Sequence, residues 1–373
     1  MDHSRARRLS RRQAINLLGV GAGLGFVTAF QEESAVLAAS AQATATKVTF
    51  PKGAIIRTVL KDVSPDALGS GATLFHDHLS LSSPRPYAPP SKEPVKPQWL
   101  EDVASVVEEV KAARKDGVTC IVSGGTRDLG QKPADVRKIA EQVASTGMHI
   151  VLSDALWTQP AYPPDIPGKS EDQIAEEFTR DAIAQRWGAL GELGSSMQMH
   201  PDERKVFRAI AKVHLRTGIP IFTHMPHEGC KTCGAEQLDI FESLGVNLRT
   251  VCIGHLADIR DDPRAETQKA IAKRGAFIGF DTVGHLTGAL ARTDDHVRMT
   301  LSLLEAGYED RILLSADGTS ERERKQNGGA GYAKVLTVFA PKLREAGVKD
   351  ATLHKILVDN PRRFLAFVPK RTS

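Results

Sequence analysis

The stretch ATLFHDH, residues 72–78, joins an apolar run to two histidines and indicates both the fold and the site. In a β-strand, residues i and i+2 point to the same side. His76 and His78 can therefore converge on one cation, while Asp77 points the other way. A His-x-His pair alone is a weak indication of a metal site. Four further candidate ligands follow in the chain, namely Glu192, His224, His255 and Asp317.

Apolar runs that end in a polar residue recur along the chain, and amphipathic helical patterns separate them. Eight runs are predicted strands: 72–78, 118–123, 149–154, 189–193, 219–224, 250–255, 276–281 and 312–317. Helices are predicted at 100–116, 133–145, 171–185, 202–217, 237–244, 264–274 and 294–306. This alternation predicts an α/β fold, a (β/α)8 TIM barrel. Polar residues at the carboxyl ends of its strands carry the chemistry of such a barrel.

Residues 1–43 are interpreted as an export signal. The pair Arg11 and Arg12 precedes an uncharged stretch, residues 14–30, and this arrangement resembles a twin-arginine signal. The alternative is a membrane anchor, but the stretch is short and glycine-rich for a span of about 20 apolar residues. Small residues at 39–43 suit cleavage, so we expect a periplasmic or secreted protein that begins near Thr44.

Residues 44–373 are predicted to form a single domain. Removing residues 1–43 takes away five arginines and three acidic residues and leaves a formal charge of +2, which gives no reason to expect nucleic acid binding. No later stretch approaches the length of a membrane span, so stable membrane insertion is not expected after cleavage. We expect a small-molecule substrate, and the sequence leaves open whether the chain forms a homodimer.

Several motifs together resemble one known family. They are His76-Asp-His78, Thr223-His224, Cys252-Ile-Gly-His255, Gly279-Phe-Asp281, the run 312–317 and Asn360-Pro-Arg-Arg-Phe364. Their order and spacing resemble the phosphotriesterase family of the amidohydrolase superfamily, which contains metal-dependent hydrolases on a (β/α)8 barrel. The resemblance implies two divalent cations per chain. His76, His78 and Asp317 would hold the more buried ion, and His224 and His255 the more exposed one.

The fourth predicted strand departs from many members of that family. Where they carry a carbamylated lysine between the metals, this chain reads ALGELG at residues 189–194. It resembles the glutamate-bearing branch, the phosphotriesterase homology proteins, which implies that Glu192 bridges the two ions. Glutamate is shorter than carbamyl-lysine, and the flanking Gly191 and Gly194 would permit a closer approach of the backbone. The alternative is that Glu192 is an ordinary salt-bridged carboxylate of the barrel.

The expected reaction follows from this ligand set. Imidazoles and carboxylates suit zinc, which is the metal we expect first. They also suit manganese, iron and cobalt. Two such ions with a bridging hydroxide would activate water and polarise a carbonyl or phosphoryl oxygen, with Asp317 as the catalytic proton acceptor. We predict hydrolysis of a carboxylic ester or lactone. The alternatives are a phosphotriesterase and a binding protein that retains the metals without turnover.

Five residues are candidates for substrate contact or for support of the ligands. They are Trp157, His227, Asp258, Asp281 and His285. The two aspartates would relay protons or orient the ligand histidines, or they are only N-caps or loop acids. By the resemblance, the tryptophan walls the leaving-group side of the pocket; rim packing is its alternative. The two histidines are candidates for substrate contact, with exposed histidines of no function as the alternative.

The four cysteines fall into two kinds. Cys120 and Cys252 lie in apolar strands and are predicted to be buried, inert thiols. Cys230 and Cys233 form a Cys-x-x-Cys in the loop after His224. Without a second pair they make a poor zinc site. They are interpreted either as a local disulfide of an exported protein or as two reduced thiols.

The export interpretation is tested by replacing Arg11 and Arg12 with lysine. The paired guanidinium groups are the part of a twin-arginine signal that its receptor reads, so the precursor should accumulate in the cytoplasm. Cell fractionation and immunoblotting measure this outcome. If processed protein still reaches the periplasm in normal amounts, the twin-arginine interpretation is wrong.

Overall fold

The computed structural model describes residues 48–87 and 96–370. The predicted export signal, residues 1–43, lies outside the described residues. Among the described residues, no helix is long and apolar enough to cross a membrane.

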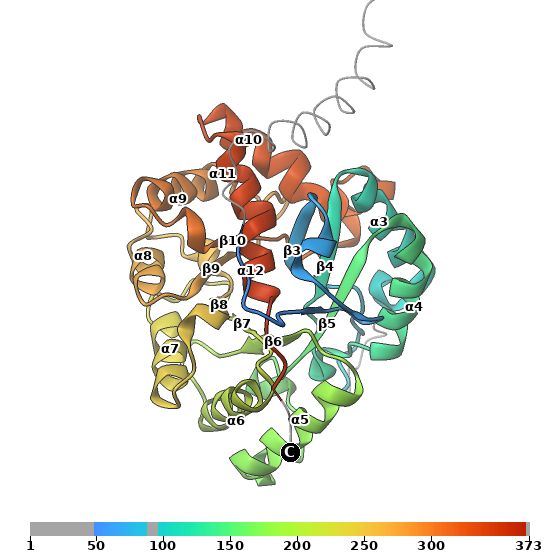
Figure 1. The fold of residues 1–373 in the computed structure, drawn as a ribbon, viewed down its shortest axis with the longest axis vertical. Coiled ribbons are helices and arrows are strands. Elements are labelled where there is room, and N and C mark those ends of the chain that lie inside the picture. Colours follow the sequence, from blue (N-terminus) through green and yellow to red (C-terminus); the bar gives the residue numbers. More distant parts are fainter. Residues whose placement is uncertain (1–47, 88–95, 371–373) are drawn as a thin grey trace, which may run out of the picture. The chain divides into compact units, whose positions relative to one another are not determined.

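Eight parallel strands form one sheet whose spatial order follows the sequence from β3 to β10 (Figure 1). Their bounds are β3 Ala72–Asp77, β4 Val118–Ser123, β5 His149–Asp154, β6 Ala189–Gly194, β7 Ile221–His224, β8 Val251–Ile253, β9 Phe277–Phe280 and β10 Ile312–Leu314. At the closing edge, the Asp317 amide donates to the His76 carbonyl over 3.3 Å. The predicted (β/α)8 barrel is therefore confirmed as a nearly closed barrel.

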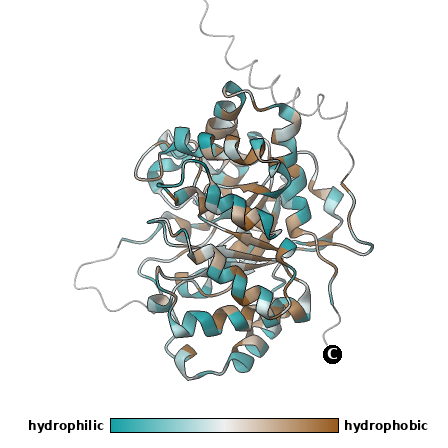
Figure 2. Cartoon of the chain, turned by 90° about the vertical axis from the view of Figure 1, so that its left-hand side faces the viewer, coloured by the Kyte–Doolittle hydropathy of each residue, from teal (hydrophilic) through white to brown (hydrophobic). Residues whose placement is uncertain are grey.

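Helices surround the strands, and each predicted helix is present with shifted ends. They are α3 Val103–Lys115, α4 Pro133–Val143, α5 Glu171–Ala184, α6 Pro201–Thr217, α7 Cys233–Ser243, α8 Glu266–Lys273 and α9 Thr293–Glu305. Local signals set several starts. Ser170 and Gln173 form a capping box at α5, and Pro201 begins α6. The strands are mostly hydrophobic, whereas the outward helix faces are hydrophilic (Figure 2).

Two parts of the fold were absent from the sequence prediction. Strands β1 (Ile56–Arg57) and β2 (Asp62–Val63) pair antiparallel, and the chain ends in α10 (Ala340–Glu345), α11 (Asp350–His354) and α12 (Asn360–Leu365). Elements this short carry too little periodicity to be recognised in a sequence. In Figure 1, α12 is seen in front of the barrel strands. Its residue Phe364 packs edge-on against Phe75 and Phe277.

The apolar core has two parts. One lies between the strands and the outer helices. The other fills the barrel, and each of the strands β3 to β10 contributes to it; its residues on these eight strands are Phe75, Cys120, Val122, Val151, Ala189, Phe222, Cys252, Phe277 and Leu313. These side chains form the floor beneath the polar residues at the carboxyl ends of the strands. Cys120 and Cys252 are buried free thiols, as predicted.

Three register irregularities interrupt the alternation of side chains. They lie between Ala72 and Thr73 and between Leu74 and Asp77 on β3, and between Leu190 and Leu193 on β6. Leu190 belongs to the outer part of the core, so strict alternation would point Glu192 outward too. The irregularity at β6 turns Glu192 into the barrel instead.

Glycine is required at position 191 because a Cβ atom there would lie 2.4 Å from the Phe222 carbonyl oxygen. Gly191→Ala should lower the free energy of unfolding by about 2 kcal/mol, as overpacking typically does. Chemical denaturation followed by circular dichroism measures this change. The control is Gly168→Ala, where nothing lies within 4 Å of the added Cβ, and it should change stability by less than about 0.5 kcal/mol. Equal stability of the two variants would contradict the close-approach argument.

Candidate metal centre

The six predicted ligands meet at one end of the barrel. They come from the carboxyl ends of five strands: β3 carries His76 and leads into His78, and the others lie on or just after β6, β7, β8 and β10. Five of the six residues are at most 3% exposed, and the Asp317 side chain is 10% exposed. Two of them, His255 and Asp317, have positive φ angles of 55° and 48°. The chain leaves the regular strand geometry there, which aims both side chains at the centre.

One group of side chains lies around the first strand. His78 Nε2 is 2.9 Å from Asp317 Oδ1 and 3.4 Å from Glu192 Oε1. His76 Nε2 is 3.7 Å from Glu192 Oε2 and 3.9 Å from Asp317 Oδ1. Two imidazoles and two carboxylates thus share a space of the size that one cation fills.

A second group lies on the other side of Glu192. His224 Nδ1 is 2.8 Å from Glu192 Oε2, and His255 Nε2 is 2.6 Å from His224 Nδ1. Two ring nitrogens this close need a proton or a cation between them, since two lone pairs repel each other. The carboxylate of Glu192 therefore stands between a His76–His78 group and a His224–His255 group.

Unpartnered buried atoms test whether a metal fits. Among the described residues, His76 Nε2, His78 Nδ1 and Asp317 Oδ1 are buried without a hydrogen-bond partner. A buried polar atom without a partner costs about 1–3 kcal/mol. Two of these atoms, His76 Nε2 and Asp317 Oδ1, face the common space, and a cation there would satisfy both. The donor set of imidazole nitrogens and carboxylate oxygens is one that divalent transition metals accept.

The charges of the site favour a cation as well. Burial raises the pKa of Glu192, but the charge of His76 and the hydrogen bond with His224 outweigh it and hold the pKa well below its usual range. The pKa of Asp317 is likewise held below its usual range, because the hydrogen bond with His78 and the charge of His76 outweigh the effect of burial. Burial lowers the pKa of His76, but the charge of Glu192 and the bond to Asp281 raise it to about 10. Metal binding would therefore displace protons from the site.

Asp281, at the end of β9, orients one histidine from each group. Its Oδ2 is 2.9 Å from His76 Nδ1, and its Oδ1 is 3.1 Å from His255 Nδ1 and accepts from the His255 amide over 2.7 Å. These contacts hold both Nδ1 atoms and leave both Nε2 atoms facing the centre. Of the roles considered for Asp281, which were proton relay, orientation of the ligand histidines and an N-cap or loop acid, these contacts fit orientation.

Asp258 and His227 form a line of contacts that leads out of the centre. Asp258 is buried, accepts from Thr282 Oγ1 over 2.7 Å and lies 2.7 Å from His227 Nδ1. The His227 side chain is 42% exposed, and its Nε2 is 3.9 Å from Asp317 Oδ2. A proton on Asp317 thus has an imidazole and a second carboxylate within a short distance.

Trp157 and His285 occupy different kinds of position. The Trp157 ring stands edge-on to the His224 ring at 5.3 Å, so it forms a wall of the site. His285, a candidate for substrate contact with an exposed histidine of no function as the alternative, is only 6% exposed, and its Nε2 is 2.5 Å from the Ala316 carbonyl. Its ring thus contacts the backbone next to Asp317, and its contact with a substrate stays a prediction. The loop after β9 folds inward, which its sequence did not indicate.

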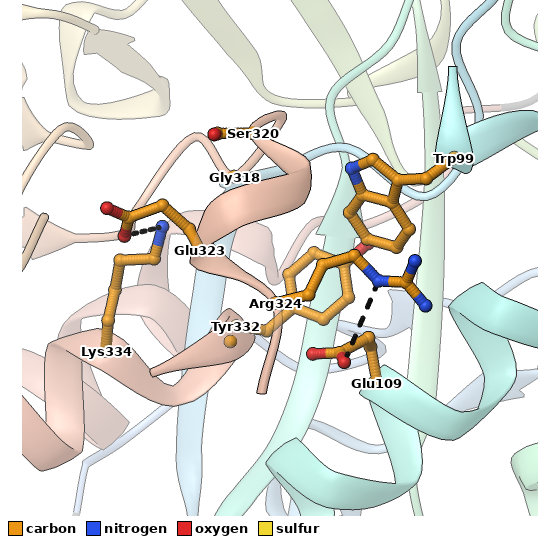
Figure 3. Close-up of a pocket in the computed structure, with 9 residues that line it drawn as sticks. Trp99, Glu109, Gly318, Ser320, Glu323, Arg324, Tyr332 and Lys334 are labelled. Carbon is orange, nitrogen blue, oxygen red and sulfur yellow. Dashed lines mark ion pairs between the residues drawn. The ribbon is translucent and has the colours of Figure 1, made fainter. Parts of the chain in front are cut away.

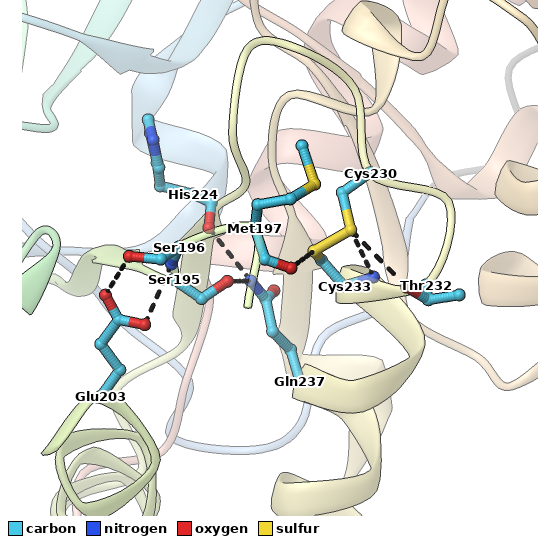
Figure 4. The surroundings of a disulfide bond; sticks show 9 residues. All are labelled: Ser195, Ser196, Met197, Glu203, His224, Cys230, Thr232, Cys233 and Gln237. Carbon is cyan, nitrogen blue, oxygen red and sulfur yellow. Dashed lines mark hydrogen bonds between the residues drawn. A yellow bond between two sulfur atoms is a disulfide. The ribbon is translucent and has the colours of Figure 1, made fainter. Parts of the chain in front are cut away.

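A polar network behind His224 was missed in the sequence. Gln237 on α7 donates to the His224 carbonyl over 3.0 Å and to Ser195 Oγ over 2.9 Å (Figure 4). Its Oε1 accepts a hydrogen bond from Thr223 Oγ1. The only sequence signal for it is a glutamine on the buried face of a helix. Cys230 and Cys233 form a disulfide at the start of α7, so the disulfide interpretation is the one the structure supports.

The loop after β10 carries buried charges of its own (Figure 3). Glu323 lies 3.2 Å from Lys334 Nζ and accepts hydrogen bonds from the amides of Leu286 and Thr287. The cavity that Lys334 and Glu109 help to line has a volume of about 10 Å³. That space holds about one water, so these charges stabilise the loop and do not form a substrate site.

The chain is similar in sequence to known proteins. Residues 55–365 match the model of the phosphotriesterase family. The phosphotriesterase homology protein of Escherichia coli K12 is 29% identical over 303 residues, which cover 79% of this chain and 98% of that protein. The N-acetyltaurine hydrolase of Mus musculus is 26% identical over 352 residues, which cover 84% of this chain and 98% of that protein.

Solved structures give the same result. The crystal structure of a resiniferatoxin-binding protein from Rhodobacter sphaeroides superposes with a TM-score of 0.74 at 30% identity, covering 84% of this chain and 95% of that one. The Escherichia coli phosphotriesterase homology protein, solved with phosphate in its active site, gives 0.69 at 27% identity and covers 79% and 99%. Because the family model spans nearly all of the barrel and these relatives match over almost their full length, the chain belongs to the phosphotriesterase family, whose relatives here include hydrolases.

Proposed function

We propose that this chain is a binuclear metal-dependent hydrolase that cleaves a carboxylic ester or lactone. The position of Glu192 carries the proposal. Its Oε1 faces His78 and its Oε2 faces His224, so one buried carboxylate contacts both histidine groups. A residue that only formed a salt bridge would need one partner, not two groups on opposite sides.

The assignment of ligands follows the two groups. His76, His78 and Asp317 would hold one ion, His224 and His255 the other, and Glu192 both. Zinc is our first assignment, and manganese, iron and cobalt suit the same donors. When bound, two such ions lower the pKa of water and polarise the bond to be cleaved.

The protein's own side chains would then transfer the proton and enclose the substrate. Asp317 would accept the proton of the attacking water, because its Oδ1 faces the centre and its carboxylate is ionised. His227, 3.9 Å away and held by Asp258, would take that proton onward to the leaving group or to solvent. Trp157 would close one side of the space beside His224.

An acyl substrate is preferred to a phosphoryl substrate. The N-acetyltaurine hydrolase relative acts on an acyl compound, and attack of water on an acyl carbon needs no specialised leaving group. A phosphotriester is the second candidate, supported by the phosphate in the active site of the Escherichia coli homologue. A binding protein without turnover is the third, and the complete ligand set is an argument against it.

Export and assembly are part of the proposal. The arginine pair in residues 1–43 supports export to the periplasm or beyond, by a route that carries folded proteins, and the Cys230–Cys233 disulfide suits an oxidising compartment. We propose no partner other than the small-molecule substrate and, in solution, a second copy of the chain.

The metal proposal predicts about two divalent ions per purified chain, measured by mass spectrometry of the metals. His76→Ala and Asp317→Ala should abolish turnover of ester and lactone substrates while the barrel stays folded, since these side chains serve the ions and not the apolar core. Removal of the ions with a chelator should have the same effect, and added zinc should restore activity. Metal-free protein with undiminished activity would refute the mechanism.

The bridge is tested by Glu192→Gln, which keeps the side-chain volume and removes the negative charge. We expect loss of at least one ion and a decrease in kcat/KM of about 100-fold or more, since even substitutions behind the ligands cost 10–100-fold. Added bicarbonate should not change the wild-type rate, because Glu192 needs no carbamate. Asp261→Asn is the control, since this exposed acid pairs with Lys231 and with no other cation in the part of the chain that the structure describes. Full metal content and a normal rate in Glu192→Gln would mean that Glu192 is only a salt-bridged carboxylate of the barrel.

A further inference from the structure

An arginine lies directly above the aromatic wall of the site. Arg85 belongs to the loop after β3, and its Cζ is 4.0 Å from the centroid of the Trp157 ring. The Trp157 ring in turn stands 5.3 Å from the His224 ring. The guanidinium group is therefore separated from a proposed metal ligand by a single aromatic side chain.

The tryptophan that holds Arg85 is itself fixed. Its backbone amide donates to Asp128 Oδ2 over 2.8 Å, and Asp128 is fully buried. A Cβ at Gly194 would lie 2.0 Å from the Trp157 carbonyl, so the backbone of β6 packs tightly against it. A guanidinium over an aromatic face keeps the N–H donors at its edge available for a ligand.

The charge of Arg85 acts on the site. Burial lowers the pKa of Arg85, and the negative charges of Asp128 and Glu192 partly offset this effect. Within residues 48–87 and 96–370, Arg85 has no carboxylate within ion-pair distance, whereas Lys231 pairs with Asp261 and Lys96 pairs with Glu321. An anion that binds Arg85 would gain a charge-assisted contact without breaking an ion pair among the described residues.

The same end of the barrel also exposes large apolar side chains. Tyr87, Met197 and Leu286 are 42%, 48% and 51% exposed and lie on the loops after β3, β6 and β9. These loops surround the carboxyl ends of the strands, where the candidate ligands lie. The entrance thus offers apolar contacts together with one arginine held on an aromatic ring.

We propose that Arg85 binds an anionic group of the substrate. The preferred substrate is then an ester, lactone or amide that carries a carboxylate or sulfonate, since both present several equivalent oxygens to a guanidinium. This inference rests on the proposed hydrolytic function and narrows its substrate class. Asp317 and the metal ligands carry out the reaction, whereas Arg85 contributes to recognition.

The test compares matched pairs of esters that differ in one charge. One pair is 4-acetoxybenzoate and its methyl ester, with the anion on the alcohol side; the other is monophenyl glutarate and phenyl butyrate, with the anion on the acyl side. Arg85→Met should lower kcat/KM about 10-fold or more for the anionic member of at least one pair, mainly through KM, and less than about twofold for the neutral members. The pair that responds identifies the side that carries the anion.

Arg260→Met is the matched control. Arg260 is an exposed arginine on the loop after β8 that forms no ion pair among the described residues, so its removal changes the net charge equally. It should leave both members of each pair within about twofold of the wild type. Arg85→Lys should recover part of the loss, because it restores the charge without the planar donors. Equal losses for anionic and neutral esters in Arg85→Met would mean that Arg85 only positions Trp157, and unchanged rates would mean that no anion is bound there.

A binding measurement separates this inference from the proposed function. If the wild type cleaves none of the four esters, calorimetric titration with glutarate and with 4-hydroxybenzoate still tests Arg85. Binding of one of these anions by the wild type and by Arg260→Met, weakened about 10-fold or more in Arg85→Met, would support the anion site although ester hydrolysis had failed. Equal affinities in all three proteins, or no binding of either anion, would overturn it.

Discussion

The buried carboxylate of Glu192 is the interaction on which the rest of the site depends. It lies 3.4 Å from His78 and 2.8 Å from His224, and its charge is screened by almost no water because the residue is 3% exposed. A carboxylate so placed stays ionised only if positive charge surrounds it. Protonated histidines can supply that charge, and so can divalent cations, which the same nitrogens and oxygens would bind more effectively.

The surrounding structure holds these groups in place. Asp281 fixes one imidazole of each histidine group, and Gln237 ties the backbone of His224 to Ser195, which directly follows the neighbouring strand β6. Beyond them, the Cys230–Cys233 disulfide shapes the start of α7. Side chains that are positioned in this way lose little conformational freedom when a ligand binds, so the site can be selective for its ions and its substrate.

The proposed reaction and the proposed recognition of the substrate take place at two different depths of the barrel mouth. At the bottom, the candidate ligands and Asp317 suit hydrolysis of an activated bond. Nearer the surface, Trp157 and Arg85 lie on loops where a substrate would enter, and changes in such loops leave the core of a barrel intact. A common reaction with different substrates is what this arrangement would produce within one family.

The sequence alone determined the barrel and its candidate ligands. Apolar runs ending in His224, His255 and Asp317 were enough to predict the strands and the end of the barrel at which they meet, because strand periodicity is local. Only the tertiary structure decided that Glu192 points inward, since a register irregularity on β6 reverses the side that simple alternation gives. It likewise decided that His285 is buried and that Arg85 lies over Trp157, because these positions depend on how separate loops fold against one another. Such contacts join residues that are far apart in the chain, and no local sequence pattern predicts them.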